Sequence, residues 1–450
     1  MKEICIIGAG PAGIMASYAA ADGDCRITVI ERNIETLKKL CLTGNGRCNF
    51  SNEDLKSEYY NFDDKHPFAG ILEEYDSEWL ESLFKENGML AIKRDGLKYP
   101  RSEKAETVKE TLMNMAREKK VRFLFSKKAV SAEKIRSDGK TEKKLIIEDD
   151  RMIRSANEKK DDEGAVRYRI GFEDGEDIVC DALIIATGGK AYPNTGSDGG
   201  GYRLARALGH TVTFTYPVLT RLFTEEKDVL ELAGVRFKAQ VKAYIDGQKI
   251  DTEDGEIQFT DKGLSGICIF KLSRYLSKPI EEGRRCEIVI DFLSEIRKDE
   301  LKRYIQGLLE KEAESGRYTG LKEAGMKVLS GMLGTQTAGL ILRRCNGING
   351  TLSKEGISEA SEELAETIKE FRVRISDHDS FSNAQVTKGG VSRDEISRNM
   401  ESTVSPGVFF AGEVTDVDGT CGGYNLHWAF ASGYKAGKAA AEYIKGLKVD

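Results

Sequence analysis

A glycine-rich turn between a short apolar strand and an alanine-rich helix is the feature that most constrains how this chain folds. The strand of residues 3–7 runs into the pattern Gly8-x-Gly10-x-x-Gly13, which opens the helix. The first glycine permits the turn, the second lets the backbone approach a pyrophosphate, and the third allows close helix–sheet packing. A second apolar run ends about 20 residues on in Glu31, whose carboxylate can accept hydrogen bonds from a ribose diol. Together these features predict a dinucleotide-binding βαβ unit.

Two further glycine-bearing strand ends favour FAD over NAD as the dinucleotide. The buried-type strand of residues 181–189, DALIIATGG, ends in glycines, and the C-terminal strand GVFFAGEV carries Gly412 at its end. The following GEVTDVDGTCGGYN leads into an apolar helix, whose N-terminal N–H groups could face the flavin pyrimidine edge and stabilise its reduced anion. Glu413 or Asp418 could hydrogen-bond the ribityl chain. We therefore expect an α/β fold with a two-dinucleotide-binding, Rossmann-like FAD domain.

Composition limits the class of protein. The 450 residues carry a formal net charge of −6 and 40% hydrophobic residues, which predicts folded domains and shows no basic footprint for nucleic acid. Nine cysteines without a CxxC pair and four scattered histidines favour a reducing cytoplasm and predict no metal site. No apolar run approaches the ~20 residues of a membrane-spanning helix, and the N-terminus lacks a signal-peptide pattern. We expect a cytoplasmic protein without nucleic-acid or membrane partners.

Seven stretches of the chain resemble the YhiN/BaiN-like flavoprotein family, described as NAD(P)/FAD-dependent oxidoreductases, some of them aminoacetone oxidase-like. They are IIGAGPAGIMAS, LTGNGRCNFSN, YPRSEKAETV, ATGGKAYPNTGSDGGGYRLARALGH, GEIQFTDKGLSGICIFKLSR, AQVTKGGVSRDEISRNMES and GVFFAGEVTDVDGTCGGYNLHWAFASG. The resemblance covers nearly the whole chain. The GRCN, TKGGV and GGYN segments are specific to this family, whereas the first glycine motif is shared by many flavoproteins.

The resemblance implies three structural parts: an FAD domain, an inserted β-barrel-like subdomain and a small helical subdomain. The order of strand and helix patterns along the chain agrees, with βα units at both ends. The expected bounds are 1–195 with 370–450 for the FAD domain, 196–293 with 346–369 for the barrel-like subdomain, and 294–345 for the helical subdomain. The charged stretches 136–144 and 157–164 are expected to be surface hairpin turns.

The resemblance also implies flavin-dependent redox chemistry, with FAD as cofactor and NAD(P)H as the candidate electron donor. Family activities include reduction of carbon–carbon double bonds in dehydro bile acids. We therefore expect a reductase of an activated C=C bond in a small, steroid-like or bile-acid-like substrate. Two alternatives stay open: a flavin amine oxidase using oxygen, and a non-catalytic, flavin-bearing RNA-binding or regulatory protein. Because no second GxGxxG follows a strand, direct NAD(P)H binding does not follow from the sequence, and neither do the substrate or the oligomeric state.

The stretch CLTGNGRCNFSN, residues 41–52, is interpreted as a flavin-side loop. Gly46 lets the backbone approach the cofactor, while Arg47 and Asn49 supply donors for the pyrophosphate or a substrate anion. The spacing of its cysteines is unlike that of flavin disulfide reductases. We expect Cys48 to be a reduced, small hydrophobe in a tight place.

His427 and Tyr192 are the candidate catalytic residues. His427 stands where the family usually carries Gln; it could donate a proton, or it could pack beneath the cofactor. Tyr192 could flank the flavin or donate a proton, or its hydroxyl could be satisfied in a buried structural role. The predicted FAD-binding residues are Gly8, Ala9, Gly10, Pro11, Ala12, Gly13, Glu31, Arg32, Gly46, Arg47, Cys48, Asn49, Val130, Ala186, Thr187, Gly188, Gly189, Gly412, Glu413, Asp418, Gly422, Gly423, Tyr424 and Asn425.

Overall fold

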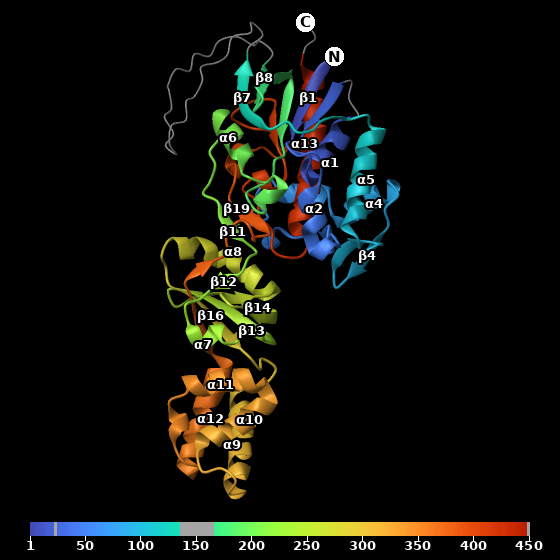
Figure 1. Ribbon diagram of the computed structural model, residues 1–450. Helices are drawn as coiled ribbons and strands as arrows, with labels where there is room; N and C mark the ends of the chain where they lie inside the picture. Colours follow the sequence, from blue (N-terminus) through green and yellow to red (C-terminus); the bar gives the residue numbers. More distant parts are fainter. Residues whose placement is uncertain (22–24, 136–165, 448–450) are drawn as a thin grey trace. The chain divides into compact units, whose positions relative to one another are not determined.

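The computed structural model describes residues 1–21, 25–135 and 166–447, which form two compact units (Figure 1). The first unit combines Met1–Pro217 with Phe381–Asp450, and the second is Val218–Ser380. Both ends of the chain therefore contribute to one unit. The two charged stretches expected to be hairpin turns lie outside the described residues.

A five-stranded parallel sheet forms the centre of the first unit. Its strands are β1 (Lys2–Ile7), β2 (Cys25–Ile30), β6 (Arg122–Leu124), β10 (Ala182–Ile185) and β20 (Val408–Phe410). Their order is β20-β10-β1-β2-β6, and each neighbouring pair is parallel. The central strands β1 and β10 read as continuous apolar runs because helices and loops cover both faces of such a sheet. The predicted α/β class with a parallel sheet is confirmed.

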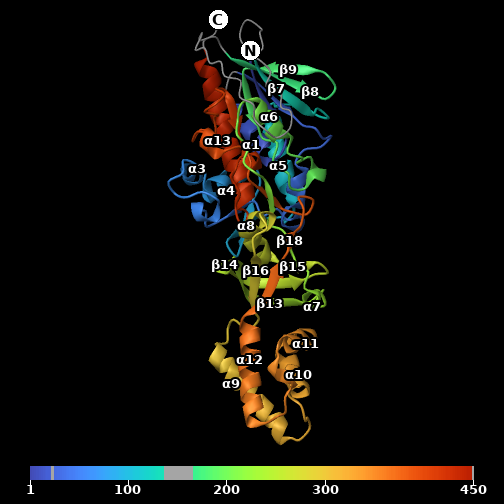
Figure 2. The same ribbon diagram turned by 90° about the vertical axis from the view of Figure 1, so that its left-hand side faces the viewer.

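Helix α1 (Pro11–Ala20) packs against the long C-terminal helix α13 (Tyr424–Gly446), as Figure 2 shows. The two helices approach closely because Gly433 and Gly437 of α13 face the backbone of α1, where a Cβ would overlap it. A third helix, α5 (Ala105–Glu118), also packs against α1. Contact between the first and last helices thus joins the two ends of the chain within the first unit.

The remaining elements of the first unit surround this core. Two small antiparallel sheets are formed by β7 (Ala129–Ile135), β8 (Arg167–Phe172) and β9 (Asp177–Cys180), and by β3 (Ser51–Asn52), β5 (Leu97–Pro100) and β4 (Ala91–Arg94). The other elements include α2 (Lys38–Leu42), α3 (Ala69–Glu74), α4 (Ser77–Glu86), α6 (Gly200–Ala207), β11 (Tyr216–Val218) and β19 (Val386–Lys388).

Residues 196–217 belong to the first unit, although the sequence-based bounds place them in the inserted part. The reason is helix α6, whose buried Tyr202, Leu204 and Ala205 are part of the core of the first unit. The inserted unit therefore begins later in the chain than expected.

The second unit contains a seven-stranded antiparallel sheet of order β17-β16-β13-β14-β15-β12-β18. Its strands are β12 (Leu222–Phe223), β13 (Arg236–Ile245), β14 (Gln248–Phe259), β15 (Gly263–Ser265), β16 (Cys286–Asp291), β17 (Phe371–Ile375) and β18 (Asp377–His378), accompanied by α7 (Lys227–Leu230) and α8 (Ile267–Glu281). The hairpin β13–β14 turns on Asp246 and Gly247, both with positive φ, as a two-residue turn requires.

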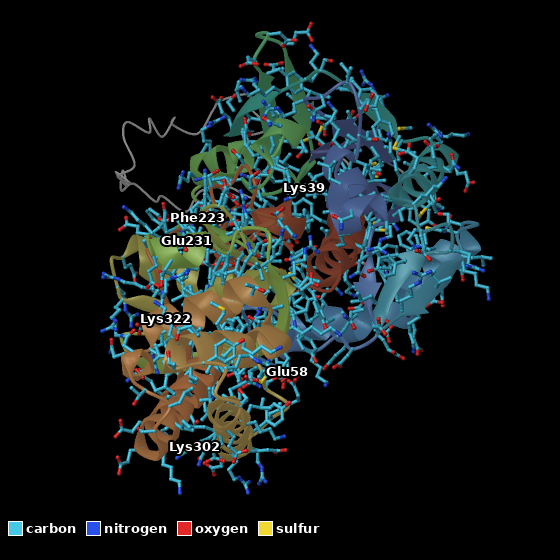
Figure 3. All side chains as sticks on the ribbon, turned by 60° about the horizontal axis from the view of Figure 1, so that its bottom comes forward. Lys39, Glu58, Phe223, Glu231, Lys302 and Lys322 are labelled. Atoms are coloured by element: carbon cyan, nitrogen blue, oxygen red, sulfur yellow. The ribbon has the colours of Figure 1, made fainter. Side chains whose placement is uncertain are left out.

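Four helices complete the second unit: α9 (Lys298–Glu314), α10 (Leu321–Leu333), α11 (Thr335–Arg344) and α12 (Lys354–Lys369). Residues 346–369 were expected in the barrel-like part, but they contain α12, which packs on α9. Its buried Ile357, Leu364 and Ile368 recur at helical spacing. On the outside of this helix pair, Lys302 of α9, labelled in Figure 3, pairs with Glu362 at 2.6 Å.

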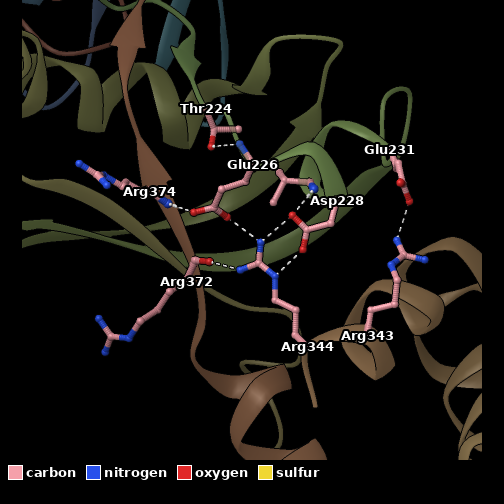
Figure 4. Close-up of polar contacts among 9 residues, drawn as sticks. Thr224, Glu226, Asp228, Glu231, Arg343, Arg344, Arg372 and Arg374 are labelled. Atoms are coloured by element: carbon pink, nitrogen blue, oxygen red, sulfur yellow. Dashed lines mark hydrogen bonds and ion pairs between the residues drawn. The ribbon is translucent and has the colours of Figure 1, made fainter. Parts of the chain in front are cut away.

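Arg344 ties the end of α11 to the sheet of the second unit (Figure 4). Its guanidinium donates to Asp228 Oδ2 at 2.7 Å, to Glu226 Oε2 at 2.6 Å, and to the Arg372 carbonyl at 2.7 Å. It also lies over the ring of Phe371, 4.5 Å from the centroid. A planar cation with this many partners fixes both position and orientation. The helical part and the sheet are thereby joined within one unit.

Candidate active site

The glycine turn after β1 leaves open space at the N-terminus of α1. Gly8 has a φ of 106°, and a Cβ there would lie 2.5 Å from the Ala186 carbonyl oxygen. A Cβ on Gly13 would lie 1.9 Å from the Gly8 oxygen, whereas one on Gly10 would meet no other described atom within 4 Å. Gly10 is the N-cap of α1, where the first N–H groups have no intrahelical partner. The turn therefore offers room and favourable electrostatics for a phosphate.

Glu31 lies beside this turn, directly after β2. One carboxylate oxygen accepts the Ala9 N–H at 2.9 Å, and the other accepts the Asn33 N–H at 2.8 Å. The second oxygen, Oε1, also accepts the Asn33 side-chain amide at 2.8 Å. These bonds fix the carboxylate next to the turn, and Oε2 keeps a further lone pair for a ribose hydroxyl. Arg32, also predicted as a cofactor residue, forms an ion pair with Asp198. Its role toward a cofactor stays a prediction.

Glu413 occupies the corresponding place at another strand end, after β20. Its Oε1 accepts the Thr387 N–H at 2.8 Å, and its Oε2 accepts a hydrogen bond from Lys39 Nζ at 2.7 Å (Lys39 is labelled in Figure 3). A Cβ on Gly189 would lie 2.4 Å from Thr387 Oγ1 and 3.2 Å from the Glu413 carboxyl carbon, so this glycine after β10 makes room for both side chains. Sequence reasoning missed Lys39 and Thr387. Thr387 stood in the TKGGV stretch, but nothing around Lys39 marked it.

The GGYN segment forms the N-terminus of α13 and packs against the GRCN loop. Gly422 and Gly423 have φ values of 135° and 91°. The Asn49 side chain, with its amide oriented to suit its neighbours, accepts the Gly423 N–H at 3.1 Å and donates to the Ser51 carbonyl at 2.8 Å. A Cβ on Gly423 would lie 2.7 Å from that same carbonyl oxygen. Two motifs far apart in the sequence therefore meet here.

Tyr424 and Asn425 order the loop that precedes α13. The Asn425 amide accepts the Gly419 N–H and donates to the Gly419 carbonyl, both at 2.8 Å. The Tyr424 ring stacks on Tyr59 with centroids 4.8 Å apart, and burial raises the pKa of its hydroxyl. Asp418 lies fully buried in the same loop. In the structure these predicted cofactor residues hold the loop, and direct contact with a cofactor stays a prediction.

Two adjacent residues of the GRCN loop differ in exposure: the arginine is exposed and the cysteine is buried. Gly46 and Arg47 are exposed, and the Arg47 guanidinium lies over the Tyr99 ring, 5.7 Å from its centroid. Cys48 is completely buried, and burial raises the pKa of its thiol to about 12. The sulfur therefore stays protonated near neutral pH, which suits a small hydrophobe and not a redox thiolate. Binding of an anion by Arg47 stays a prediction.

His427 lies inside the first unit with both ring nitrogens engaged. Its Nδ1 lies 2.9 Å from Ser51 Oγ, and its Nε2 lies 2.8 Å from the Tyr75 carbonyl oxygen. The carbonyl can only accept, so Nε2 carries the proton and Nδ1 accepts from the serine hydroxyl. Burial lowers the pKa of His427 to about 4. A fully buried, neutral imidazole with both nitrogens bonded fits the alternative of a packed residue between α13 and the neighbouring loop, and a role as proton donor stays a prediction.

The other candidate donor, Tyr192, is half-buried in the loop after β10. Its backbone is left-handed, with φ 56° and ψ 59°, and its N–H donates to the Phe381 carbonyl at 2.9 Å. Such backbone conformations are costly for residues other than glycine, and they cluster at functional sites. Val130, in contrast, is an exposed residue of β7. Its predicted cofactor contact is not tested by the structure.

Tyr202 supplies an independent sign of a ligand. Its hydroxyl is fully buried and has no hydrogen-bond partner among the described residues. Burial, followed by the charges of Glu413 and Asp416, raises the pKa of this hydroxyl. Buried polar atoms are normally satisfied, so an orphaned donor near Glu413 fits a polar ligand. Together with the open space at Gly10 and the carboxylate of Glu31, this arrangement fits FAD.

Comparison with known proteins identifies the family. The family model described as HI0933-like protein Rossmann domain matches residues 2–156 and 141–439. The chain is 33% identical to a 3-dehydro-bile acid delta(4,6)-reductase of Clostridium scindens over 98% of this chain and 100% of that protein. The chain belongs to the HI0933-like Rossmann-domain family. It is thus an FAD-dependent oxidoreductase, as predicted.

Other similarities are more distant. The chain is 25% identical to a ribosomal RNA dihydrouridine synthase of Escherichia coli, over 95% of both chains. A solved structure, the 3-ketosteroid delta1-dehydrogenase of Sterolibacterium denitrificans, is 10% identical with a TM-score of 0.47 and covers 98% of this chain and 100% of its own.

The described residues bear on two further sequence predictions, that of no metal site and that of no membrane span. They contain no group of three or more His, Cys, Asp and Glu side chains placed to hold a metal ion. Among the helices of the described part, none has the length and apolar character needed to cross a bilayer. The cytoplasmic location and the absence of nucleic-acid partners stay predictions.

Proposed function

We propose that the protein is a reductase of a carbon–carbon double bond conjugated to a carbonyl group, with a small steroid-like ketone as substrate and NAD(P)H as electron donor. The observation that carries this proposal is the 33% identity, over the whole chain, to a reductase named for a 3-dehydro bile acid. The name describes alkene reduction next to a ketone. The cradle of glycines and carboxylates in the first unit supports FAD as the redox group.

The chain's own residues would bind and orient FAD from three strand ends. The N–H groups at Gly10 would hold the pyrophosphate, Glu31 the ribose, and Glu413 the ribityl chain. The N-terminus of α13 at Gly423 would lie beside the flavin, where the partial positive charge of a 23-residue helix favours added electrons. When bound, FAD supplies the hydride that is added to the substrate.

Reduction of a conjugated alkene also needs a proton at the carbon next to the carbonyl. Tyr192 stays the candidate donor because it is half-buried, held in a left-handed conformation and close in sequence to Gly189 of the cradle. The hydrogen bond from its backbone N–H to the Phe381 carbonyl holds its backbone in place. We assign it this role as part of the proposal.

An anaerobic two-step experiment tests the proposal. Protein reconstituted with FAD is first mixed with NADPH or NADH, and loss of the oxidised-flavin absorbance is followed. A 3-oxo steroid with conjugated double bonds is then added. Return of the absorbance, with a product two hydrogen atoms heavier by mass spectrometry, supports the proposal. If no such ketone reoxidises the reduced protein, the proposal is wrong. If a simple amine bleaches the flavin where NAD(P)H does not, the proposal is also wrong and the amine oxidase is favoured.

A second candidate substrate is uridine in ribosomal RNA. The observation in its favour is the similarity to two proteins named ribosomal RNA dihydrouridine synthase, each 25% identical over at least 95% of this chain. Uridine also offers an alkene conjugated to a carbonyl. The test adds unmodified ribosomal RNA, transcribed in vitro, to the reduced protein and measures dihydrouridine by nucleoside mass spectrometry. Dihydrouridine formation without steroid turnover would favour this second candidate.

A further inference from the structure

The half-buried ion pair between Lys39 and Glu413 joins two segments that border the predicted cofactor cradle. The side chains of Lys39 and Glu413 are 23% and 18% exposed, and Nζ lies 2.7 Å from Oε2. The pair spans 374 positions of sequence and connects α2 to the loop after β20. Because this ion pair is partly buried and joins two distant segments, it differs from an exposed surface ion pair, whose contribution to stability is normally small.

Both partners are fixed relative to the glycine turn. On the Lys39 side, the N–H of Leu37 donates to the Ala9 carbonyl at 3.1 Å, just before α2 begins. On the Glu413 side, the preceding Gly412 lies so close to α1 that a Cβ would come within 2.8 Å of the Ala12 Cβ. The ion pair therefore has a defined position beside the N-terminus of α1.

Two glycines after β10 lie close to Glu413, and the side chains of Thr387 and Ser197 are the nearest neighbours of their Cβ positions, at 2.4 Å from Gly189 and 3.1 Å from Gly188. A Cβ on Gly189 would lie 3.2 Å from the Glu413 carboxyl carbon, and one on Gly188 would lie 4.0 Å from Oε2. The orphaned hydroxyl of Tyr202 is close enough for the charge of Glu413 to act on it. An anchored carboxylate and an unpartnered buried donor occur together here, which points to a ligand at this pair.

We propose that Lys39 is a positioning residue for the dinucleotide. It neutralises Glu413 and, together with the Thr387 N–H, orients the carboxylate to accept hydrogen bonds from the hydroxyls of the cofactor. Without Lys39, the carboxylate would be an uncompensated charge in the same cradle as the cofactor pyrophosphate. The proposal rests on FAD as the cofactor but does not depend on which substrate is reduced.

The test measures the dissociation constant of FAD from the apoprotein by fluorescence titration. Lys39→Met should weaken FAD binding about tenfold, the loss typical of removing one partner of a charged hydrogen bond. Lys39→Arg should restore binding to within about threefold of wild type, because the charge is retained. Lys38→Met on the same short helix is the matched control and should leave the constant unchanged. If Lys39→Met binds FAD as tightly as wild type, the proposal is wrong. It is also wrong if Lys39→Met and the control Lys38→Met lose FAD affinity equally.

A double-mutant cycle keeps the proposal falsifiable if Lys39→Met alone folds poorly. In a Glu413→Gln background the carboxylate charge is gone, so Lys39→Met should no longer weaken FAD binding. An undiminished effect of Lys39→Met in that background would overturn the proposed partnership. Wild-type protein in the same titration separates the claims: if it fails to bind FAD, the cofactor assignment itself fails. Failure to reduce a steroid would leave these binding results untouched.

Discussion

Gly433 of α13 lies directly against the Ala12 carbonyl of α1: a Cβ on Gly433 would come within 2.3 Å of that oxygen. Gly433→Ala should therefore force the helices apart and lower the free energy of unfolding by about 2 kcal/mol, since overpacking outweighs the better helix propensity of alanine. Chemical denaturation of the apoprotein measures this change. Gly446→Ala, on the same helix but with no described atom near its Cβ position, should be neutral or stabilising. Equal stabilities of the two variants would contradict the packing argument.

Replacing Gly10, the N-cap of α1, and replacing Gly13, in its first turn, should affect different properties: FAD binding in one case and stability in the other. Gly10→Ala places a methyl group in open space, so the apoprotein should keep its stability to within about 1 kcal/mol while FAD binding weakens. Gly13→Ala places the methyl group 1.9 Å from the Gly8 oxygen, so the apoprotein itself should be destabilised. Thermal unfolding of both apoproteins and FAD titration separate the effects. Tight FAD binding by Gly10→Ala would show that the cradle is not used.

The βαβ start of the chain could be predicted because its determinants are local. Gly8, Gly10, Gly13 and Glu31 act within one turn and two neighbouring strands, and the structure places them together. In contrast, residues 346–369 were expected in the barrel-like subdomain, yet they contain α12, whose buried apolar residues recur at helical spacing.

Contacts between distant segments could not be predicted from local patterns. Lys39 sits in an ordinary charged stretch, and its importance depends on Glu413, which only the tertiary fold brings to it. The same holds for His427, where the sequence allowed a proton donor or a packed residue. Its hydrogen bonds to Ser51 and Tyr75 come from other segments of the chain, and they favour a packed residue. Arg47 and Asn49 share one loop, yet Arg47 is exposed and Asn49 binds Gly423.

Removing the Tyr192 hydroxyl should separate cofactor binding from substrate reduction. Tyr192→Phe keeps the ring and the left-handed backbone, so FAD affinity and reduction by NAD(P)H should match wild type. Transfer to the conjugated ketone should slow by about 100-fold, the lower end of the range for loss of a general acid. Anaerobic stopped-flow mixing measures both half-reactions. If both proceed at the wild-type rate, the proton comes from another group.

The buried imidazole of His427 should make the protein sensitive to acid. Its pKa in the folded state is about 4, below the ordinary value of 6.5, because burial disfavours the cation. The unfolded chain therefore binds a proton at higher pH than the folded chain does, so stability is fully present above about pH 6.5 and falls as the pH drops toward 4. The loss by pH 4 should reach about 3 kcal/mol.

His427→Gln provides the test, because glutamine does not titrate and its amide can still donate and accept hydrogen bonds. Urea unfolding of both proteins at about pH 7 and about pH 5 should show a smaller drop in stability for the variant. The two proteins share every other titratable group, so the difference between their pH dependences reports His427 alone. Parallel pH dependences would mean that the imidazole has the same pKa in the folded and the unfolded chain, and the hydrogen-bond assignment to Ser51 and Tyr75 would then have to be revised.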